Sequence, residues 1–213
     1  MARAPVGYRA RVELSEAISR RRMARRFTGE PVAPEVLDRM LSLCLDAPSA
    51  GFTQGVDLVV LEGAAARGRF WELATDARWR SSGPSADGLL AAPVVVVPVA
   101  EPDAYVRRYG EPDKSASGLA GVPARDWDVP YWQVDASFVV MQLLLAAEDS
   151  GLGALFFRLH APSDAVLAGL GAPSRRVTIG AVALGHRAGG ERTTSPGRRP
   201  RRAVEDSVHR DRW

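Results

Sequence analysis

The sequence predicts one α+β domain, in which helices and strands form packed layers around a single core. The 213 residues, 46% of them hydrophobic, are enough for such a core. Segments with the helical period intermix with short β-branched runs, and no internal repeat or linker divides the chain. We therefore expect residues 1–213 to form one domain, with residues 1–11 flexible and residues 186–213 as an extended tail that packs on a partner subunit.

The first half of the chain alternates between the helical period and the two-residue period of strands. Val12–Arg22 and Pro34–Asp46 have the spacing of amphipathic helices. Asp57–Glu62 has the alternation of a strand, and Ala64–Trp79 is expected to be a helix followed by a glycine- and serine-rich connection. Val94–Val99 is predicted to be a fully buried strand.

The second half begins with a weak pattern between Glu101 and Tyr131, where we expect a short helix and a long loop, either a lid, a binding loop or disordered. Gln133–Ser150 is apolar nearly all round and should be a central helix. Ala154–Leu159 follows as a strand, Ser163–Leu170 as a helix capped by the Ser163 side chain, and Val177–Leu184 as the last core strand.

The composition excludes several classes of protein. Cys44 is the only cysteine, so no intrachain disulfide can form, and its apolar neighbours favour a small buried side chain in a reducing compartment. No apolar run is long enough to span a bilayer, so we expect a cytoplasmic protein with no membrane partner. The pI of about 9.5 accompanies a net charge of only +3, which does not by itself indicate a nucleic-acid partner.

The sequence lacks the residue patterns that several kinds of site require. The Gly151-Leu152-Gly153 turn follows a helix and lacks the third glycine of a dinucleotide fingerprint. His160, His186 and His209 are scattered, which gives no metal-ligand spacing, and no phosphate loop or nucleophile elbow is present. If the protein is an enzyme, a cofactor is expected to carry the chemistry.

The informative element is the run from Arg21 to Phe27, followed by Pro31-Val32, an amphipathic helix and Ala47-Pro48-Ser49. Alone, an arginine cluster at a helix end is usually a solvated charge run that favours the helix dipole. In this order the elements resemble the N-terminal signature of the nitroreductase family. The resemblance continues through Gln54, the Gly151–Gly153 turn, Ile179–Gly185 and Arg198-Arg199-Pro200.

The resemblance covers the chain from about Glu16 and implies a three-layer α/β/α fold with a mixed, mainly antiparallel sheet. It also implies a homodimer with an exchanged C-terminal extension and a bound FMN. Arginines would grip the FMN phosphate, for which their planar, charged fork is suited. The residues implied in cofactor binding are Arg21, Arg22, Met23, Arg25, Pro48, Ser49, Ala50, Gln54, Phe157, Arg158, Arg198 and Arg199.

Three positions depart from the family pattern. Met23 stands where a serine is common, Phe52 where an asparagine is common, and Gly55-Val56 where Pro-Trp is common. Because methionine cannot donate a hydrogen bond to phosphate, the site would depend more on its arginines. Phe52, Trp127, Tyr131 and Trp132 are the expected substrate-binding residues. An equally open reading is that the last three rings dock their loop on its own core.

The resemblance implies an FMN-dependent oxidoreductase that passes electrons from NADH or NADPH to a small electron-poor acceptor, such as a nitroaromatic or a quinone, by a ping-pong mechanism. The flavin would carry the chemistry, so no protein side chain is assigned as catalytic. One alternative is oxygen-dependent reduced-flavin chemistry of the dimethylbenzimidazole-synthase type. The other is a non-enzymatic basic module that binds nucleic acid.

Overall fold

A four-stranded sheet organises the part of the chain that the computed structural model describes, residues 12–189 and 199–213. Its strands are β1 (Val56–Leu61), β2 (Val94–Ala100), β3 (Gly153–Phe157) and β4 (Ala181–Gly185), in the spatial order β1-β2-β4-β3. Every neighbouring pair is antiparallel. Met23 adds an isolated parallel bridge to Ala154 in β3. The predicted α+β class and mainly antiparallel sheet are confirmed.

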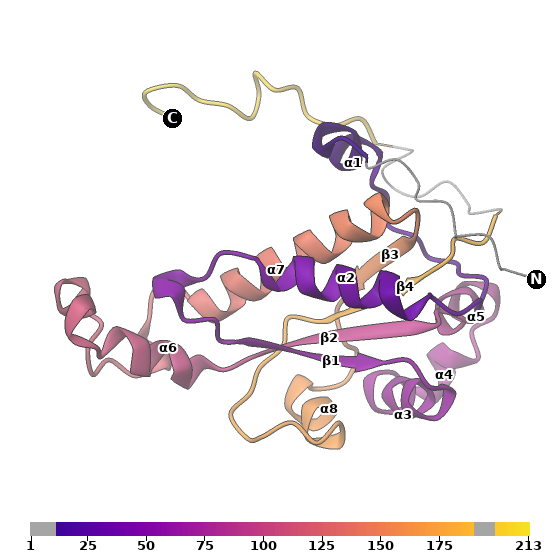
Figure 1. Ribbon diagram of the computed structural model, residues 1–213, viewed down its shortest axis with the longest axis horizontal. Helices are drawn as coiled ribbons and strands as arrows, with labels where there is room; N and C mark the ends of the chain where they lie inside the picture. The colour runs from indigo at the N-terminus through magenta and orange to yellow at the C-terminus, as the bar shows by residue number, and fades with distance from the viewer. Residues whose placement is uncertain (1–11, 190–198) are drawn as a thin grey trace, which may run out of the picture.

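Helices surround this sheet in the described residues (Figure 1). The α-helices are α1 (Leu14–Arg20), α2 (Pro34–Leu45), α3 (Ala64–Ala74), α4 (Ala77–Arg80), α5 (Pro84–Leu90), α6 (Pro102–Tyr109), α7 (Tyr131–Asp149) and α8 (Ser163–Gly169). Short 3-10 helices are η1 (Ala50–Phe52), η2 (Pro112–Ser117) and η3 (Ala124–Asp126).

The alternation of side chains along β2 creates two separate hydrophobic layers. Val94 and Val96 belong to the cluster that includes α2 and α7, whereas Val95 and Val97 belong to the cluster that includes α3 and α8. In Figure 1, α2 and α7 lie on one side of the strands and α3 and α8 on the other. Burying each of these valines contributes about 1.5–3 kcal/mol, and the result is the expected three-layer arrangement.

Helix α7 is central, as predicted, but it is not covered on every side. It packs on α2 and on the strands, and its inward residues include Val139, Leu143 and Leu144. Phe138 and Met141 point the other way and keep 44% and 48% of their surface exposed. The described protomer therefore leaves an apolar stripe along the outer side of α7.

The predicted helix over 64–79 is two helices. At Thr75 the backbone is extended, with φ −139° and ψ 158°, and this ends α3. The Asp76 carboxylate then accepts a hydrogen bond from the backbone N–H of Trp79 at 2.6 Å and begins α4. An aspartate at this position is a strong helix-starting signal, and the periodicity of the apolar residues obscured it.

Three further expectations were wrong. The glycine- and serine-rich connection contains α5, which Pro84 begins. Ser163 does not cap α8, because the N-cap residue is Pro162 and no side chain bonds there. The last strand begins only at Ala181, because Gly180 has a φ of 146° and packs against the Phe157 carbonyl.

The expectation for residues 1–11 lies outside the described residues, as does the part of the tail over 190–198. Residues 199–213 are exposed throughout, and Figure 1 shows this segment, in yellow, running away from the sheet. Among the described helices, none has the length and apolar character needed to cross a membrane.

Cys44 lies on the buried side of α2, as its apolar neighbours predicted. Its thiol donates to the Leu41 carbonyl at 3.2 Å. Burial raises the pKa of the Cys44 thiol to about 11, so the thiol stays protonated near neutral pH and behaves as a small packing group.

Gly185→Ala is expected to lower the free energy of unfolding by about 1–3 kcal/mol, because a Cβ there would overlap the ring of Pro93 in the core. Gly68→Ala is the matched control. Gly68 lies in α3 with open space around it, so the same change should raise stability by about 0.5–1 kcal/mol. Urea unfolding followed by circular dichroism measures both changes. Shifts of the same sign and size at both positions would contradict the packing described for Gly185.

Candidate functional site

The arginine-rich segment after α1 lies along one edge of the sheet. It is extended, and the backbone N–H of Ala24 donates to the Ala154 carbonyl at 2.9 Å. Further along, Phe27 forms an antiparallel bridge with Arg187, just beyond β4. These bonds place residues 21–28 beside β3, which ends at Phe157 and is followed by Arg158, two of the residues that the family resemblance implies in cofactor binding.

Arg187 fastens this segment to the end of α7. Its guanidinium donates to the Glu148 carboxylate at 2.7 Å, and also to the carbonyls of Arg22 at 3.3 Å and Leu152 at 3.4 Å. The Glu148 side chain is largely buried, so its charge depends on this pairing. The residue was not predicted from the sequence, where a lone arginine after the last strand carries no distinct signal.

The three N-terminal arginines of the predicted phosphate site differ in their surroundings. Nη1 of Arg21 is buried and has no hydrogen-bond partner within the described residues. Arg22 is exposed and turns back to the end of α1, donating to the carbonyls of Ser19 at 2.7 Å and Arg21 at 2.9 Å. Arg25 is exposed and donates to the Met23 carbonyl at 3.4 Å. A buried guanidinium nitrogen without an acceptor is suited to an anion, which makes Arg21 the strongest candidate.

The other residues predicted to bind the cofactor near these arginines differ in their burial. The Met23 side chain packs against both hydrophobic clusters, which agrees with its inability to bind phosphate. Phe157 stacks on Trp71 with ring centroids 5.4 Å apart, so its side chain belongs to the core. Arg158 follows β3 and is exposed. Of the two tail arginines, Arg199 is exposed, and Arg198 lies outside the described residues.

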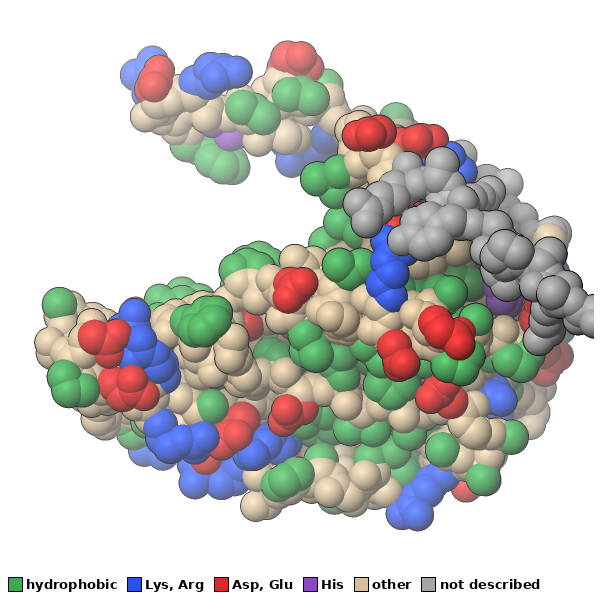
Figure 2. Space-filling view, in the orientation of Figure 1, with side chains coloured by type: hydrophobic (Ala, Val, Ile, Leu, Met, Phe, Trp, Pro, Cys, Tyr) green, Lys and Arg blue, Asp and Glu red, His purple; other side chains and the backbone are tan. Residues whose placement is uncertain are grey.

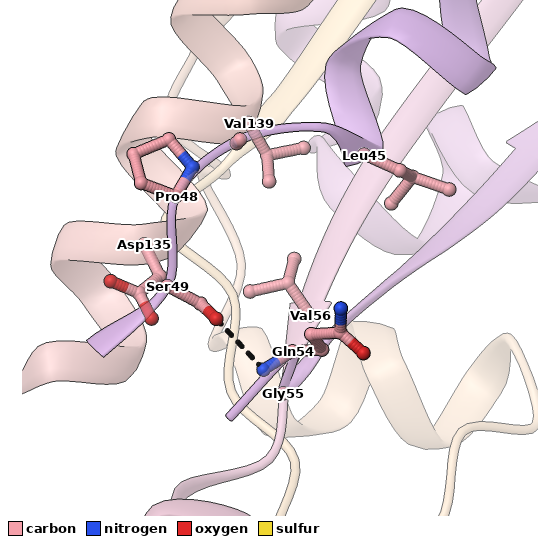
Figure 3. A pocket seen from close by; sticks show the side chains of 9 residues that line it. Leu45, Pro48, Ser49, Gln54, Gly55, Val56, Asp135 and Val139 are labelled. Carbon is pink, nitrogen blue, oxygen red and sulfur yellow. Dashed lines mark hydrogen bonds between the residues drawn. The ribbon is translucent and has the colours of Figure 1, made fainter. Parts of the chain in front are cut away.

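A pocket of about 270 Å³ opens beside the Ala47-Pro48-Ser49 turn (Figure 3). Its lining residues come from the end of α2, the following turn, the start of β1 and the first half of α7. They are Leu45, Ala47, Pro48, Ser49, Gln54, Gly55, Val56, Asp135 and Val139. The predicted residues Pro48, Ser49 and Gln54 are thus brought together at one cavity, and Asp135 joins them.

The turn beside this pocket has an unusual backbone. Gly51, Phe52 and Gln54 have φ values of 63°, 57° and 52°, in the left-handed region. For the two non-glycine residues this conformation costs about 1–3 kcal/mol each. The backbone N–H of Gln54 donates to the Ser49 hydroxyl at 3.0 Å, as Figure 3 shows, while the Phe52 side chain remains 76% exposed.

Asp135 and Tyr105 form a buried polar pair beneath this turn. One Asp135 carboxylate oxygen accepts hydrogen bonds from the backbone N–H of Ala50 at 2.9 Å and from the Tyr105 hydroxyl at 2.7 Å. Burial, followed by the bond to Asp135, holds the pKa of the Tyr105 hydroxyl well above its ordinary value, so it remains a donor. Sequence reasoning missed this pair, although an aspartate within the apolar part of the predicted helix was an available signal.

The aromatic residues of the 110–131 loop lie in the interior. Trp127 and Trp132 are both buried, and Trp127 packs edge-on against Tyr131 with centroids 5.8 Å apart. Tyr105 and Tyr109 of α6 complete the cluster. None of these aromatic residues lines the pocket beside Ser49. This packing agrees with the open alternative that the rings dock the loop on its own core, and a contact with substrate stays a prediction.

The two halves of the predicted FMN site lie at opposite ends of α7. Asp135 near its start binds the Ala50 turn, and Glu148 near its end binds Arg187 beside the arginine segment. Thirteen residues separate them, which corresponds to about 20 Å at the helical rise of about 1.5 Å per residue. One protomer therefore presents the phosphate-binding candidates and the Pro48-Ser49 turn at well-separated places.

The described residues thus form a three-layer α+β domain with an arginine segment beside β3 and a turn-lined pocket beside α7. The family model described as the Nitroreductase family matches residues 18–186. The chain belongs to that family.

Solved structures agree with this fold. A nitroreductase family protein from Streptococcus pneumoniae is 19% identical, with a TM-score of 0.68 over 92% of this chain and 99% of that one. A protein from Staphylococcus epidermidis, named as an NAD(P)H:FMN oxidoreductase, is 18% identical, with a TM-score of 0.68 over 94% and 97%. A protein from Exiguobacterium sibiricum, named as a nitroreductase in complex with FMN, is 18% identical, with a TM-score of 0.67 over 93% and 97%.

Arg187→Ala should lower the free energy of unfolding by about 1–3 kcal/mol, because it leaves the Glu148 carboxylate with only the longer Arg20 ion pair of 3.9 Å and releases two backbone carbonyls. Arg175→Ala removes an exposed ion pair with Asp103 and should cost less than about 1 kcal/mol. Chemical denaturation of both variants gives the comparison. Equal losses would mean that Arg187 is only another surface charge.

Proposed function

We propose that the protein is an FMN-dependent oxidoreductase that takes electrons from NADH or NADPH and passes them to a small electron-poor acceptor, such as a nitroaromatic or a quinone. Membership of the Nitroreductase family supports this class of activity. The observation that carries the assignment to FMN is the buried Nη1 of Arg21, which has no partner among the described residues. It lies in the segment that matches the family's phosphate-binding signature.

The chain's own residues would hold and orient the cofactor. Arg21 would bind the FMN phosphate together with Arg25, and a tail arginine such as Arg199 would join them in the assembled protein. Arg22 has a smaller share in this proposal, because it already donates to the end of α1. The bound FMN would accept a hydride from the nicotinamide and deliver electrons to the acceptor.

The pocket beside Ser49 would face the flavin ring. Its walls combine apolar groups from Pro48 and Val139 with polar groups from Ser49 and Gln54, and this mixture suits a flat, partly polar ring system. No protein acid or base is needed for hydride transfer to the ring. The nicotinamide would leave before the acceptor enters the same pocket, which is the ping-pong order.

We further propose that the protein is a homodimer in which each flavin site combines both subunits. The distance of about 20 Å between the two half-sites along α7 supports this, since a second copy could bring its own turn to the first copy's arginines. The exposed stripe with Phe138 and Met141 offers an apolar interface. In Figure 2 the tail stands clear of the body around an open space, with hydrophobic side chains on both sides, and this space would receive the partner.

The flavin assignment is tested by titrating FMN into the apoprotein and into two arginine variants. Arg21→Ala should weaken FMN binding by about one to two decades, since a lost charged hydrogen bond costs roughly 1.5–3 kcal/mol. Arg69→Ala on the exposed side of α3 should change the affinity by less than about twofold. Calorimetry gives the affinities, with circular dichroism to confirm folding.

Three outcomes of this titration bear on the proposal. No uptake of FMN by the unaltered protein would overturn it, and binding to nucleic acid that collapses with added salt would point to the basic-module alternative. Equal affinities of both variants would remove Arg21 from the site. Destruction of the flavin chromophore under air with NADPH would favour oxygen-dependent flavin chemistry over acceptor reduction.

Met141→Lys should convert the dimer to monomer and weaken FMN binding together with it, because a charge would be buried at the proposed interface. Ala65→Lys is the matched control. Ala65 is exposed on α3, which lies on the opposite face of the sheet from α7, so this change should leave the dimer intact. Light scattering measures the mass of each variant. A compact monomer of the unaltered protein that still holds FMN would contradict the shared site.

A further inference from the structure

Helix α6 contacts the strained turn and the following Gly55 through three residues on one face of the helix. The Tyr105 ring packs so closely on Gly55 that a Cβ there would lie 2.6 Å from Cε2 of the ring. One turn later, Nε of Arg108 donates to the Gly51 carbonyl at 2.7 Å. The Tyr109 ring lies next to the same glycine, where a Cβ would be 3.1 Å from Cε2. Because positions three and four apart share one face of a helix, α6 covers the turn with a single side.

Two polar contacts, one from α7 and one from α6, bind adjacent residues of the turn. The Asp135 carboxylate of α7 accepts the backbone N–H of Ala50, and Arg108 of α6 donates to the carbonyl of Gly51. The left-handed stretch begins at Gly51 itself, with a φ of 63°, and continues at Phe52 with a φ of 57°. A backbone conformation that phenylalanine disfavours persists only where the surroundings fix it, and these two contacts fix both of its preceding residues.

Each anchor is itself oriented by a further group. The Tyr105 hydroxyl donates to the same Asp135 oxygen that binds Ala50, and Asp135 is only 2% exposed. The Arg108 guanidinium is bound by both carboxylate oxygens of Asp113, at 2.7 Å each. A two-point bond of this kind fixes the plane of the guanidinium, which leaves Nε directed at Gly51.

We propose that Asp135 and Arg108 are positioning residues that clamp the Ala50–Gln54 turn in its left-handed conformation, and that this clamp sets the acceptor end of the pocket. The first part rests on the contacts alone. The second part rests on the proposed function, because Gln54 of the turn and the adjacent Ser49 form the pocket wall that an acceptor would meet.

The test compares Asp135→Leu and Arg108→Ala with Arg107→Ala in the full-length protein. Arg107 is the neighbour of Arg108 on α6, is largely exposed and donates to the Glu101 carboxylate at 2.7 Å, so it is a matched control. Hydrogen exchange of the peptide that contains Ala50–Gln54 should be at least about tenfold faster in the first two variants, since each loses a charged hydrogen bond. Arg107→Ala should exchange like the unaltered protein. The same exchange rate in all three variants would overturn the clamp.

Asp135→Asn provides a second test of the same contact. An amide oxygen can still accept from both Ala50 and Tyr105, so this variant should keep exchange within about threefold of the unaltered protein. If Asp135→Leu does not fold, as judged by circular dichroism, the comparison of Arg108→Ala with Arg107→Ala decides the clamp alone. Unchanged exchange in Arg108→Ala would then overturn it.

The functional part is measured with the FMN-loaded enzyme and 1,4-benzoquinone as acceptor. Arg108→Ala should raise the KM for the quinone by about tenfold and change kcat by less than about twofold, as expected for a loss of binding alone. Faster exchange with an unchanged KM would overturn the positioning role. If the chain binds no FMN, the proposed function fails, while the exchange comparison still decides the clamp.

Discussion

The packing of α7 between α2 and the valine-rich face of the sheet fixes the distance between the two ends of the molecule that carry the site. Nine of its residues are buried, and each large apolar side chain among them contributes about 1.5–3 kcal/mol. The helix is therefore a rigid spacer. Asp135 near one end holds the Ala50 turn, and Glu148 near the other holds Arg187. Both half-sites depend on where this helix places its two carboxylates.

The same helix accounts for the surfaces that remain open. A helix that is apolar all round is typical of a position covered on every side, whereas in the described protomer α7 packs on α1, α2 and the sheet but keeps an exposed apolar stripe. Phe138 and Met141 therefore stay exposed, and so do Leu14 and Ile18 on α1. A second copy is the simplest cover for this area, since a symmetric contact doubles each apolar group that it buries. The contact that buries this apolar area would then also complete the flavin site.

The long, strongly periodic elements could be predicted from the sequence, and the short ones could not. Pro34–Asp46, Val94–Val99 and Gln133–Ser150 matched α2, β2 and α7 to within two residues, because burial dictates their patterns. Helix α5 was missed because Ser85 and Gly88 lower its helical propensity. Its buried Leu89 and tertiary packing override that preference. The break at Thr75 was missed because one capping aspartate outweighs the apolar period around it.

The site could be predicted as a set of segments but not as a set of contacts. The arginines of the N-terminal cluster are equivalent in sequence, yet Nη1 of Arg21 is buried whereas Arg22 is exposed, because α1 ends between Arg20 and Arg21. The Gly55 departure from the family's proline also depends on distant residues. The Tyr105 ring occupies the space that any side chain at position 55 would need. Such differences follow from tertiary packing, which periodicity does not encode.

Burying Asp135 costs stability, but it fixes the conformation of the turn that contains Ala50. Removing a carboxylate from water costs several kcal/mol, and the described residues offset this with two hydrogen bonds from neutral groups, Ala50 N–H and the Tyr105 hydroxyl. The left-handed Phe52 and Gln54 add about 1–3 kcal/mol of strain each within the same few residues. An apolar side chain at 135 would avoid the first cost but would leave the Ala50 N–H without its acceptor. Costs that gather at one pocket-lining turn are typical of a functional site, so the buried carboxylate is best understood through the turn that it holds.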